Sequence, residues 1–206
     1  MDRKLWLTVS LNCVLTVLLT NLPFLPGPHL LYLPAQLFFS SGMFLGILGF
    51  LLIPIGLVWT IWAFIKHPEP RLSKAFAILC WALPATALVS TTWLANHTRD
   101  ISRNLAMSNA AELIERVEKH YQEQGAYPET LEQLAMDQPS PWVIGIPAYF
   151  YSKTDNAYTL SFTQNVILGF NYEVVVFDPS GLHKAEGELT TLYDTGLANW
   201  KYYIYD

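Results

Sequence analysis

The side chains that carry most enzyme and metal chemistry follow no catalytic spacing in this chain. The histidines include no His-Glu-x-x-His pair, so the sequence predicts no metal site and no cofactor. The serines occur without the Gly-x-Ser-x-Gly turn of hydrolases, and no phosphate-binding or dinucleotide-binding glycine motif is present. Glu186 and Glu188 would share one face of a strand, which indicates a solvated edge rather than a glycosidase pair. We therefore predict no catalytic residue. The histidines are His29, His67, His97, His120 and His183.

Cysteine and charge usage limit the remaining chemistry. Cys13 and Cys80 both fall in long apolar segments, where we expect small packing residues. Residues 97–206 contain no cysteine, so that part has no disulfide, no thiol nucleophile and no cysteine-based zinc site. The same part carries 7 basic and 15 acidic residues, whereas residues 1–96 carry 5 and 2. An acidic domain without a basic stripe argues against nucleic acid as a partner.

Three charge-free apolar segments are the elements that must position any functional part of the chain. They cover about residues 5–22, 37–65 and 75–95, and about 20 helical residues span the hydrocarbon core of a bilayer. The first is predicted to stay in place rather than be cleaved as a signal peptide, because no Ala-x-Ala-like site follows it. None contains Asp, Glu, Lys or Arg, so no ion path or transporter site is indicated. The lipid bilayer is therefore the first predicted partner.

A face of small residues lies in the second apolar segment. Gly42 and Gly46 have the GxxxG spacing and Gly49 extends it, which lets two helices approach closely. The simpler interpretation is a contact within a three-helix bundle. The sharper one is the interface of a homodimer.

Basic residues of the membrane part indicate its orientation. Arg3, Lys4 and the loop Lys66–Lys74 hold all of them. The positive-inside bias then places the N-terminus and this loop in the cytoplasm. Three spans leave residues 97–206 on the other side.

The third segment is predicted to continue as one helix from Ala75 to about Gln124, kinked at Pro84. No glycine or proline falls between Asn96 and Gln124, and strong helix formers dominate the second half. Gly125 is the expected C-terminal cap. Apolar residues recur at helical spacing and predict a buried face. They are Ala106, Ala110, Leu113, Val117 and Tyr121.

After Pro128 the pattern predicts a short helix followed by an antiparallel sheet. Thr130–Gln133 fits a capping box that opens a helix through Met136. From Tyr149 the apolar period shifts towards two, which is typical of strands. The domain is expected to be α+β, a long helix packed on the sheet. The predicted strands are Tyr149–Lys153, Tyr158–Thr163, Asn171–Phe177 and Trp200–Tyr205, with turns at Thr154–Ala157 and Asp178–Gly181.

Aromatic residues crowd these strands. Sheet propensity and packing on the helix account for most of them. Tyr203 and Tyr205 lie on the opposite face from Trp200 and Tyr202, and we interpret these two tyrosines as a candidate surface for binding protein or glycan.

The segment from Glu118 to Leu134 reads EKHYQEQGAYPETLEQL. An apolar helix that runs into an amphipathic one and ends in Tyr-x-x-x-Gly-x-Tyr-Pro is similar to the major pseudopilins of type II secretion and to type IV pilins. The resemblance covers about Ala75–Phe162 and implies a pilin-like fold in the periplasm of a bacterium. The chain departs from these families in two ways. Two membrane segments precede the helix, and no prepilin cleavage motif starts it.

The sequence thus predicts an integral membrane protein with a three-helix transmembrane region, residues 1–96, and a pilin-like extracytoplasmic domain, residues 97–206. We expect a non-enzymatic, multi-pass inner-membrane protein whose periplasmic domain binds a protein partner in an envelope or secretion assembly. One alternative is a membrane-anchored immunity protein whose acidic domain captures a toxin. Another is a membrane-bound enzyme acting on lipid or peptidoglycan, which would need an acid, a base or a nucleophile clustered in one cleft.

Overall fold

The chain forms two compact units in a computed structural model. The helical unit comprises Met1–Pro23 and Leu33–Thr98, and the outer unit comprises Phe24–Tyr32 and Arg99–Asp206. The division of the long helix falls between Thr98 and Arg99, and Phe24–Tyr32 belongs to the outer unit although it lies between two apolar helices in the sequence. The structure describes residues 3–65, 71–134, 139–154, 156–167 and 171–206.

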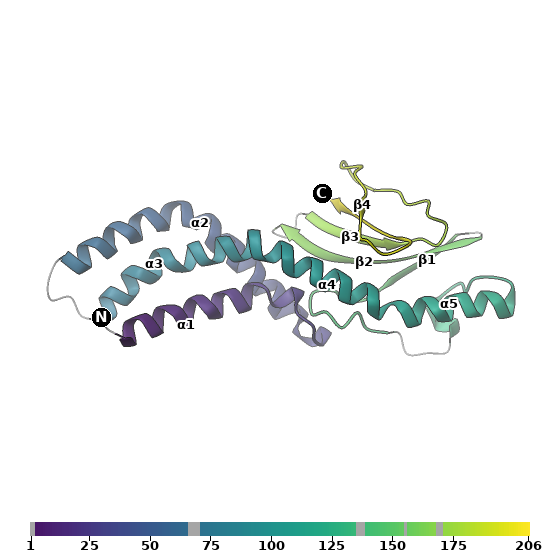
Figure 1. Ribbon diagram of the computed structural model, residues 1–206, viewed down its shortest axis with the longest axis horizontal. Helices are drawn as coiled ribbons and strands as arrows, with labels where there is room; N and C mark the ends of the chain where they lie inside the picture. Colours follow the sequence, from purple (N-terminus) through teal and green to yellow (C-terminus); the bar gives the residue numbers. More distant parts are fainter. Residues whose placement is uncertain (1–2, 66–70, 135–138, 155, 168–170) are drawn as a thin grey trace. The chain divides into compact units, whose positions relative to one another are not determined.

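Three helices are long and apolar enough to cross a membrane, as the sequence predicted. They include α1 (Arg3–Thr20), α2 (Tyr32–Ile65) and α3 (Arg71–Val89) (Figure 1). Residues 66–70 of the basic loop, on which the predicted orientation depends, lie outside the described residues. Helix α1 packs on α3 through an apolar cluster. Its buried members are Leu5, Val9, Ala75, Ile78 and Ala82.

The third helix continues beyond α3 without an intervening loop, as predicted. A π-helical segment, η3 (Ser90–Leu94), leads into α4 (Ala95–Asn109). Only Ala110 separates α4 from α5 (Ala111–Gln124), and its N–H still donates to the carbonyl of Ala106. The predicted cap at Gly125 is confirmed by its left-handed φ of 73°. The sequence did not predict the π-helical turn within this helix.

Hydroxyl side chains around η3 bond back to the helix backbone. Thr91 and Thr92 each donate to the carbonyl four residues earlier, and Thr98 does the same to Leu94. Such bonds satisfy the hydroxyl groups within the helix and often bend it, as is compatible with the π-helical turn here.

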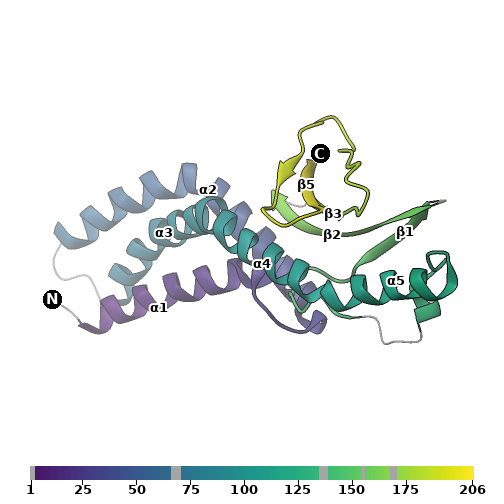
Figure 2. The same ribbon diagram turned by 45° about the vertical axis from the view of Figure 1, so that its right-hand side comes forward.

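The outer unit contains a five-stranded antiparallel sheet in the order β1-β2-β3-β5-β4 (Figure 2). The predicted limits of β3 and β5 match the structure, and β1 and β2 begin one residue from their predicted starts. The two-residue β4 was not predicted, and β2 extends further than expected. The strands are β1 (Phe150–Thr154), β2 (Ala157–Ile167), β3 (Asn171–Phe177), β4 (Tyr193–Asp194) and β5 (Trp200–Tyr205).

The predicted turns and the short helix are found in part. The turn at Asp178 is confirmed, because Gly181 donates its N–H to the Asp178 carbonyl. Within the hairpin turn, Asp155 lies outside the described residues. The short helix is the 3-10 segment η4 (Leu131–Leu134), whose predicted end at Met136 also lies outside them. The side chain of Gln133 accepts from the N–H of Glu129, one residue before the predicted cap.

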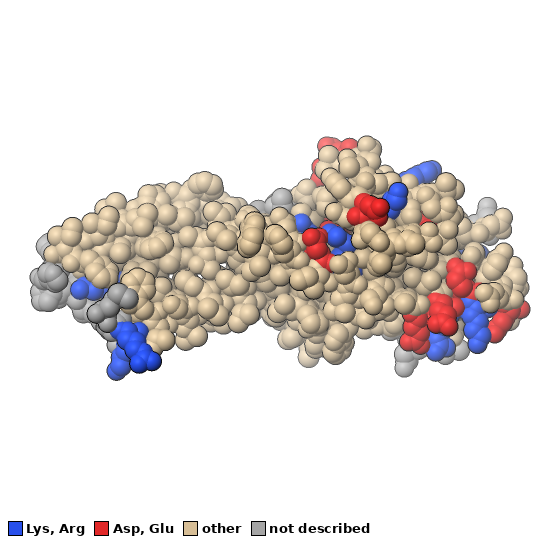
Figure 3. Space-filling view, viewed as in Figure 1, with Lys and Arg blue, Asp and Glu red and all other residues tan. Residues whose placement is uncertain are grey.

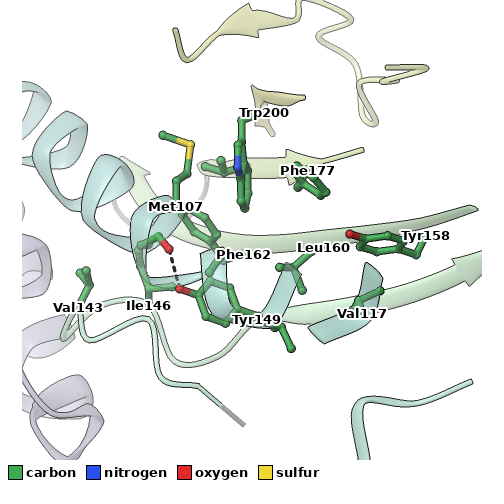
Figure 4. Close-up of a cluster of buried hydrophobic side chains, with 14 residues drawn as sticks. Met107, Val117, Val143, Ile146, Tyr149, Tyr158, Leu160, Phe162, Phe177 and Trp200 are labelled. Atoms are coloured by element: carbon green, nitrogen blue, oxygen red, sulfur yellow. Dashed lines mark hydrogen bonds between the residues drawn. The ribbon is translucent and has the colours of Figure 1, made fainter. Parts of the chain in front are cut away.

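The helix and the sheet bury a common core (Figure 4). Four of the five predicted helix positions, from Ala106 to Val117, are buried, but Tyr121 is 42% exposed. The Tyr149 hydroxyl donates to the Ala106 carbonyl at 2.6 Å and joins the chain before β1 to α4. Burying each large apolar side chain contributes about 1.5–3 kcal/mol. The sheet supplies six of these side chains, Tyr158, Leu160, Phe162, Val175, Phe177 and Trp200.

The connection between α1 and α2 is part of the outer unit. Pro26 forms an isolated antiparallel bridge with Val143. The Gly27 N–H donates to the Trp142 carbonyl at 3.1 Å, and the Ile144 N–H donates to the Leu25 carbonyl at 3.0 Å. A β-carbon at Gly27 would lie 2.9 Å from the Ile144 side chain, so only glycine allows this close approach.

Candidate functional site

The most concentrated polar chemistry of the outer unit lies between α4 and the sheet. Helix α4 contributes Arg99, Ser102 and Arg103, β2 contributes Gln164 and β3 contributes Glu173. We call these five side chains the charge cluster. Ser102, Arg103, Gln164 and Glu173 are buried, and the Arg99 side chain is 11% exposed.

Glu173 is the centre of the charge cluster. Its Oε1 accepts from Arg103 Nε at 2.6 Å and from Gln164 Nε2 at 2.8 Å. Its Oε2 accepts from Arg103 Nη2 at 2.8 Å, and Arg99 Nε lies 3.4 Å away. The guanidinium of Arg103 thus binds the carboxylate in the two-pronged geometry that suits both groups. With its side chain 1% exposed, Glu173 is held entirely by protein donors.

The neutral members complete the network. Ser102 Oγ donates to Gln164 Oε1 at 2.5 Å, and Gln164 Nε2 also approaches the Arg99 carbonyl at 3.3 Å. Gln164 therefore uses both ends of its amide. This orientation leaves its NH₂ group to donate to Glu173.

Two neighbours balance and shield Arg103. Asp100 Oδ1 accepts from Arg103 Nη2 at 2.8 Å, and this carboxylate is 61% exposed. The guanidinium carbon lies 3.9 Å from the centre of the Tyr202 ring, a cation–π arrangement. Two arginines therefore face two carboxylates, one buried and one at the surface.

The two arginines, which lie beyond the apolar segment 75–95, respond differently to burial. Burial lowers the pKa of Arg99, and the nearby Glu173 opposes this only in part. Burial would also lower the pKa of Arg103, but its hydrogen bond to Glu173 and the Glu173 charge outweigh burial and raise it. Arginine is always charged in proteins, so both stay cationic at neutral pH.

This geometry suits a fastening role better than catalysis. Both oxygens of Glu173 are occupied and the carboxylate is closed to solvent, so a substrate would have to separate α4 from the sheet to reach it. Removing one partner of a buried ion pair typically costs about 3–5 kcal/mol, because the other charge stays buried and uncompensated. The charge cluster therefore ties α4 to β2 and β3.

The sequence interpretation missed the charge cluster, although signals for it exist. Arg99 and Arg103 lie at helical spacing with Ala106 and Ala110, on the face that turned out to be buried. Glu173 is the one charge inside the otherwise uncharged strand β3. A charge that interrupts a buried pattern on two elements indicates a buried pair.

The two tyrosines predicted to form a binding surface differ in exposure. Tyr203 is buried at 4% exposure, whereas Tyr205 is 44% exposed. Burial raises the pKa of Tyr203, and the charge of Glu186 adds to this. A β-carbon at Gly187 would lie 3.2 Å from the Tyr205 ring, so the segment after β3 passes close to this face. Only Tyr205 offers substantial accessible surface, and its binding role stays a prediction.

The three glycines of the small face pack inside the helical unit. A β-carbon at Gly42 would lie 2.3 Å from Thr20 Cγ2, and one at Gly46 would lie 3.1 Å from the Leu88 backbone. At Gly49 the nearest atoms, 3.3 Å away, include Pro84 Cβ. These contacts account for the small residues within a single chain. The homodimer remains an untested alternative.

A second polar network lies inside the helical unit and contains no charge. Ser90 Oγ accepts from Asn21 Nδ2 at 2.6 Å and shares a hydrogen bond with Thr20 at 2.7 Å. Thr98 Oγ1 donates to Asn21 Oδ1 at 2.9 Å. The network joins α1 to η3, which gives the π-helical turn a structural reason.

Among the described residues, no group of three or more His, Cys, Asp or Glu side chains is arranged to hold a metal ion. No protein-family model, no curated protein and no solved structure matches the chain. The geometry of the two units is therefore the basis for assigning a function.

Proposed function

We propose that this protein is a non-enzymatic, membrane-anchored binding protein whose outer unit, a pilin-like domain, engages a protein partner. The observation that carries the proposal is the charge of the accessible surface. In the described part of the outer unit, ten acidic residues are exposed against four basic ones. Two further cationic groups, Arg99 and Arg103, are committed to the charge cluster.

The acidic side chains gather around α5 and the turn that follows it (Figure 3). Arg116 and Lys119 are the exposed basic residues of α5, and each lies within 4 Å of a glutamate. The surface therefore keeps a negative excess, which favours a partner with a basic face and speeds its encounter at low salt. The exposed acids of this region are Glu112, Glu115, Glu123, Glu129 and Glu132.

Two biological settings share this chemistry. In the leading one the partner is a component of an envelope or secretion assembly, in keeping with the pilin-like arrangement. In the second the outer unit neutralises a basic toxin as an immunity protein. In both settings the proposed membrane anchor keeps the outer unit attached to the bilayer.

The test is capture by the full-length protein in lipid nanodiscs, followed by identification of cross-linked proteins. A triple variant, Glu112→Gln, Glu115→Gln and Glu123→Gln, should lose the partner. The matched control, Glu186→Gln with Glu188→Gln, should keep it. Capture should also weaken as salt rises, because exposed charges are screened. Recovery of envelope components supports assembly, and recovery of one basic effector supports immunity. A partner retained by the triple variant would remove the acidic surface from the proposal.

The proposed location is a bacterial inner membrane, with the N-terminus in the cytoplasm and the outer unit in the periplasm. A reporter that is active only in the periplasm should work when fused after Asp206. The same reporter inserted within residues 66–74 should be silent. The opposite pattern would reverse the orientation.

A further inference from the structure

We propose that the outer unit itself dips into the lipid interface through Leu30, Leu31 and Trp142, which we call the apolar tip. The proposal rests on the membrane anchoring proposed above but not on partner binding. The apolar tip has one proposed binding partner, the lipid leaflet at which the α1–α2 connection emerges. It would insert to the depth of the headgroups and the upper acyl chains.

Two distant segments of the chain build the apolar tip. Leu30 and Leu31 lie in the 3-10 segment η2 (His29–Leu31), and Trp142 precedes the bridge between Val143 and Pro26. The Trp142 carbonyl accepts from the Gly27 N–H, which joins the backbone of Trp142 to the first segment three residues before Leu30.

The apolar tip is exposed and surrounded by uncharged sequence. Leu30 is 87% exposed, Leu31 39% and Trp142 53%. Residues 20–34 and 139–147 contain no Asp, Glu, Lys or Arg. The exposed charges of the rest of the outer unit are mostly acidic, whereas the sequence around the apolar tip is uncharged. An exposed apolar patch of this sort indicates an interaction site.

The backbone at Trp142 is fixed in an unusual conformation. Its φ of 54° lies in the left-handed region, which bulky side chains rarely adopt. Its carbonyl is bonded to Gly27, and its N–H donates to Ser140 Oγ at 3.1 Å. Such outliers persist where surrounding structure enforces them, often at functional positions.

The length of α2 indicates that the apolar tip contacts lipid. Helix α2 has 34 residues, begins directly after Leu31 and carries no charge. At 1.5 Å per residue it is about 51 Å long, whereas the hydrocarbon core is about 30 Å thick and the whole bilayer about 40–45 Å. At the upper tilt of about 40° the helix still rises about 39 Å. At that tilt the apolar start of α2 extends past the hydrocarbon core but not past the bilayer, which places it in the interfacial layer, where indole rings are enriched.

The experiment uses the full-length protein in bilayers of phosphatidylethanolamine and phosphatidylglycerol, with plain or brominated acyl chains. The Trp142 fluorescence is the difference between the native protein and Trp142→Phe. It should lose most of its intensity in brominated lipid. Trp200, which is 5% exposed in the core of the outer unit, is the negative control through Trp200→Phe. Trp59 of α2 is the positive control through Trp59→Phe.

The outcomes separate the two proposals. If Trp59 is quenched and Trp142 behaves like Trp200, the outer unit does not enter the interface and the inference is overturned. If neither Trp59 nor Trp142 is quenched, the membrane anchoring fails and the inference falls with it. Protease resistance of the outer unit verifies that each variant is folded. Trp142→Tyr replaces Trp142→Phe if the latter unfolds, because it keeps an interfacial ring and its spectrum can be separated.

Discussion

The helical unit and the outer unit use the same apolar residue types with opposite exposure. In the helical unit Phe50 is 82% exposed and Leu11 is 68% exposed. In the outer unit Phe162 is 0% and Leu160 is 1% exposed. Many large apolar side chains on one helical surface favour an apolar solvent, whereas the outer unit buries its large apolar side chains in a core of its own.

Buried polar groups follow the same division. The helical unit buries hydroxyl and amide groups at Thr20, Asn21 and Ser90, which carry no charge. The outer unit buries the ions Arg103 and Glu173. The helical unit thus buries neutral groups, whereas the outer unit buries an ion pair and gives Arg103 a second carboxylate partner, Asp100, at its surface.

The largest expected effect is a charge in the core of the outer unit. Leu113 is 0% exposed, so Leu113→Asp removes apolar burial and buries an unpaired carboxylate. The loss should exceed about 4 kcal/mol and unfold the outer unit while the membrane helices stay inserted. Limited proteolysis checks this. Leu182→Asp is the control, since Leu182 is 76% exposed. A protease-resistant outer unit with Asp at position 113 would contradict the packing described here.

The next effect comes from the charge cluster. Glu173→Gln keeps the shape but leaves Arg99 and Arg103 without their shared carboxylate. We expect a loss of about 3–5 kcal/mol in the free energy of unfolding of the outer unit, measured by denaturant titration. Glu112→Gln removes one partner of the exposed pair with Arg116 and should cost less than about 1 kcal/mol. Equal losses in the two variants would rule out the fastening role.

A smaller effect tests whether exposed side chains contact lipid in the helical unit and water in the outer unit. Leu11→Asp places a carboxylate on a site that is 68% exposed. If lipid surrounds it, insertion of α1 should become less favourable by about 2.5–3.5 kcal/mol, measurable by a membrane-insertion assay. An exposed position in water would tolerate the same change, as Leu182→Asp should. Normal insertion of the variant would place this face of α1 away from lipid.

The smallest effect is a difference in alkaline stability. All eleven tyrosines fall in the outer unit. Burial raises the pKa of Tyr151 from 10 to about 12, with a contribution from Glu129, and burial also raises the pKa of Tyr149 and Tyr158. The unfolded chain then loses these protons first, so the free energy of unfolding should fall as pH rises from 10 towards 12.

Tyrosine absorbance and circular dichroism during alkaline titration measure this loss. Tyr151→Phe removes one titrating group and should make the outer unit less sensitive over the same pH range. The helical unit, which lacks tyrosine, should not share this dependence. If the stability of the Tyr151→Phe variant falls with pH as steeply as that of the native protein, ionisation of Tyr151 does not cause the alkaline loss.

Local patterns predicted the regular elements well. The strand β3 was predicted from β-branched and aromatic residues that end at an Asp-Pro-Ser-Gly turn, and the helix from an unbroken run of helix formers closed by Gly125. The two-residue strand β4 was missed because Tyr193 and Asp194 alone are too few to show an alternating pattern. Its pairing depends on β5, which supplies the hydrogen-bond partners.

Contacts between distant residues were beyond the reach of local patterns. Arg103 and Glu173 are 70 positions apart, and each alone reads as a solvated charge. The bridge between Pro26 and Val143 joins two proline-rich, uncharged stretches that look like plain connections. The burial of Tyr203 was missed for the same reason, because alternation in β5 does not reveal that the segment around Glu186 and Gly187 lies close to that face.

The Pro26–Val143 bridge also sets an order for biogenesis. Val143 is translated 117 positions after Pro26, and at about 5–20 residues per second roughly 6–23 s separate the two events. During that interval the α1–α2 connection has been synthesised while its bridging residue has not. The outer unit can therefore complete its fold only after Val143 is made, and its first segment, Phe24–Tyr32, waits for the rest of the domain.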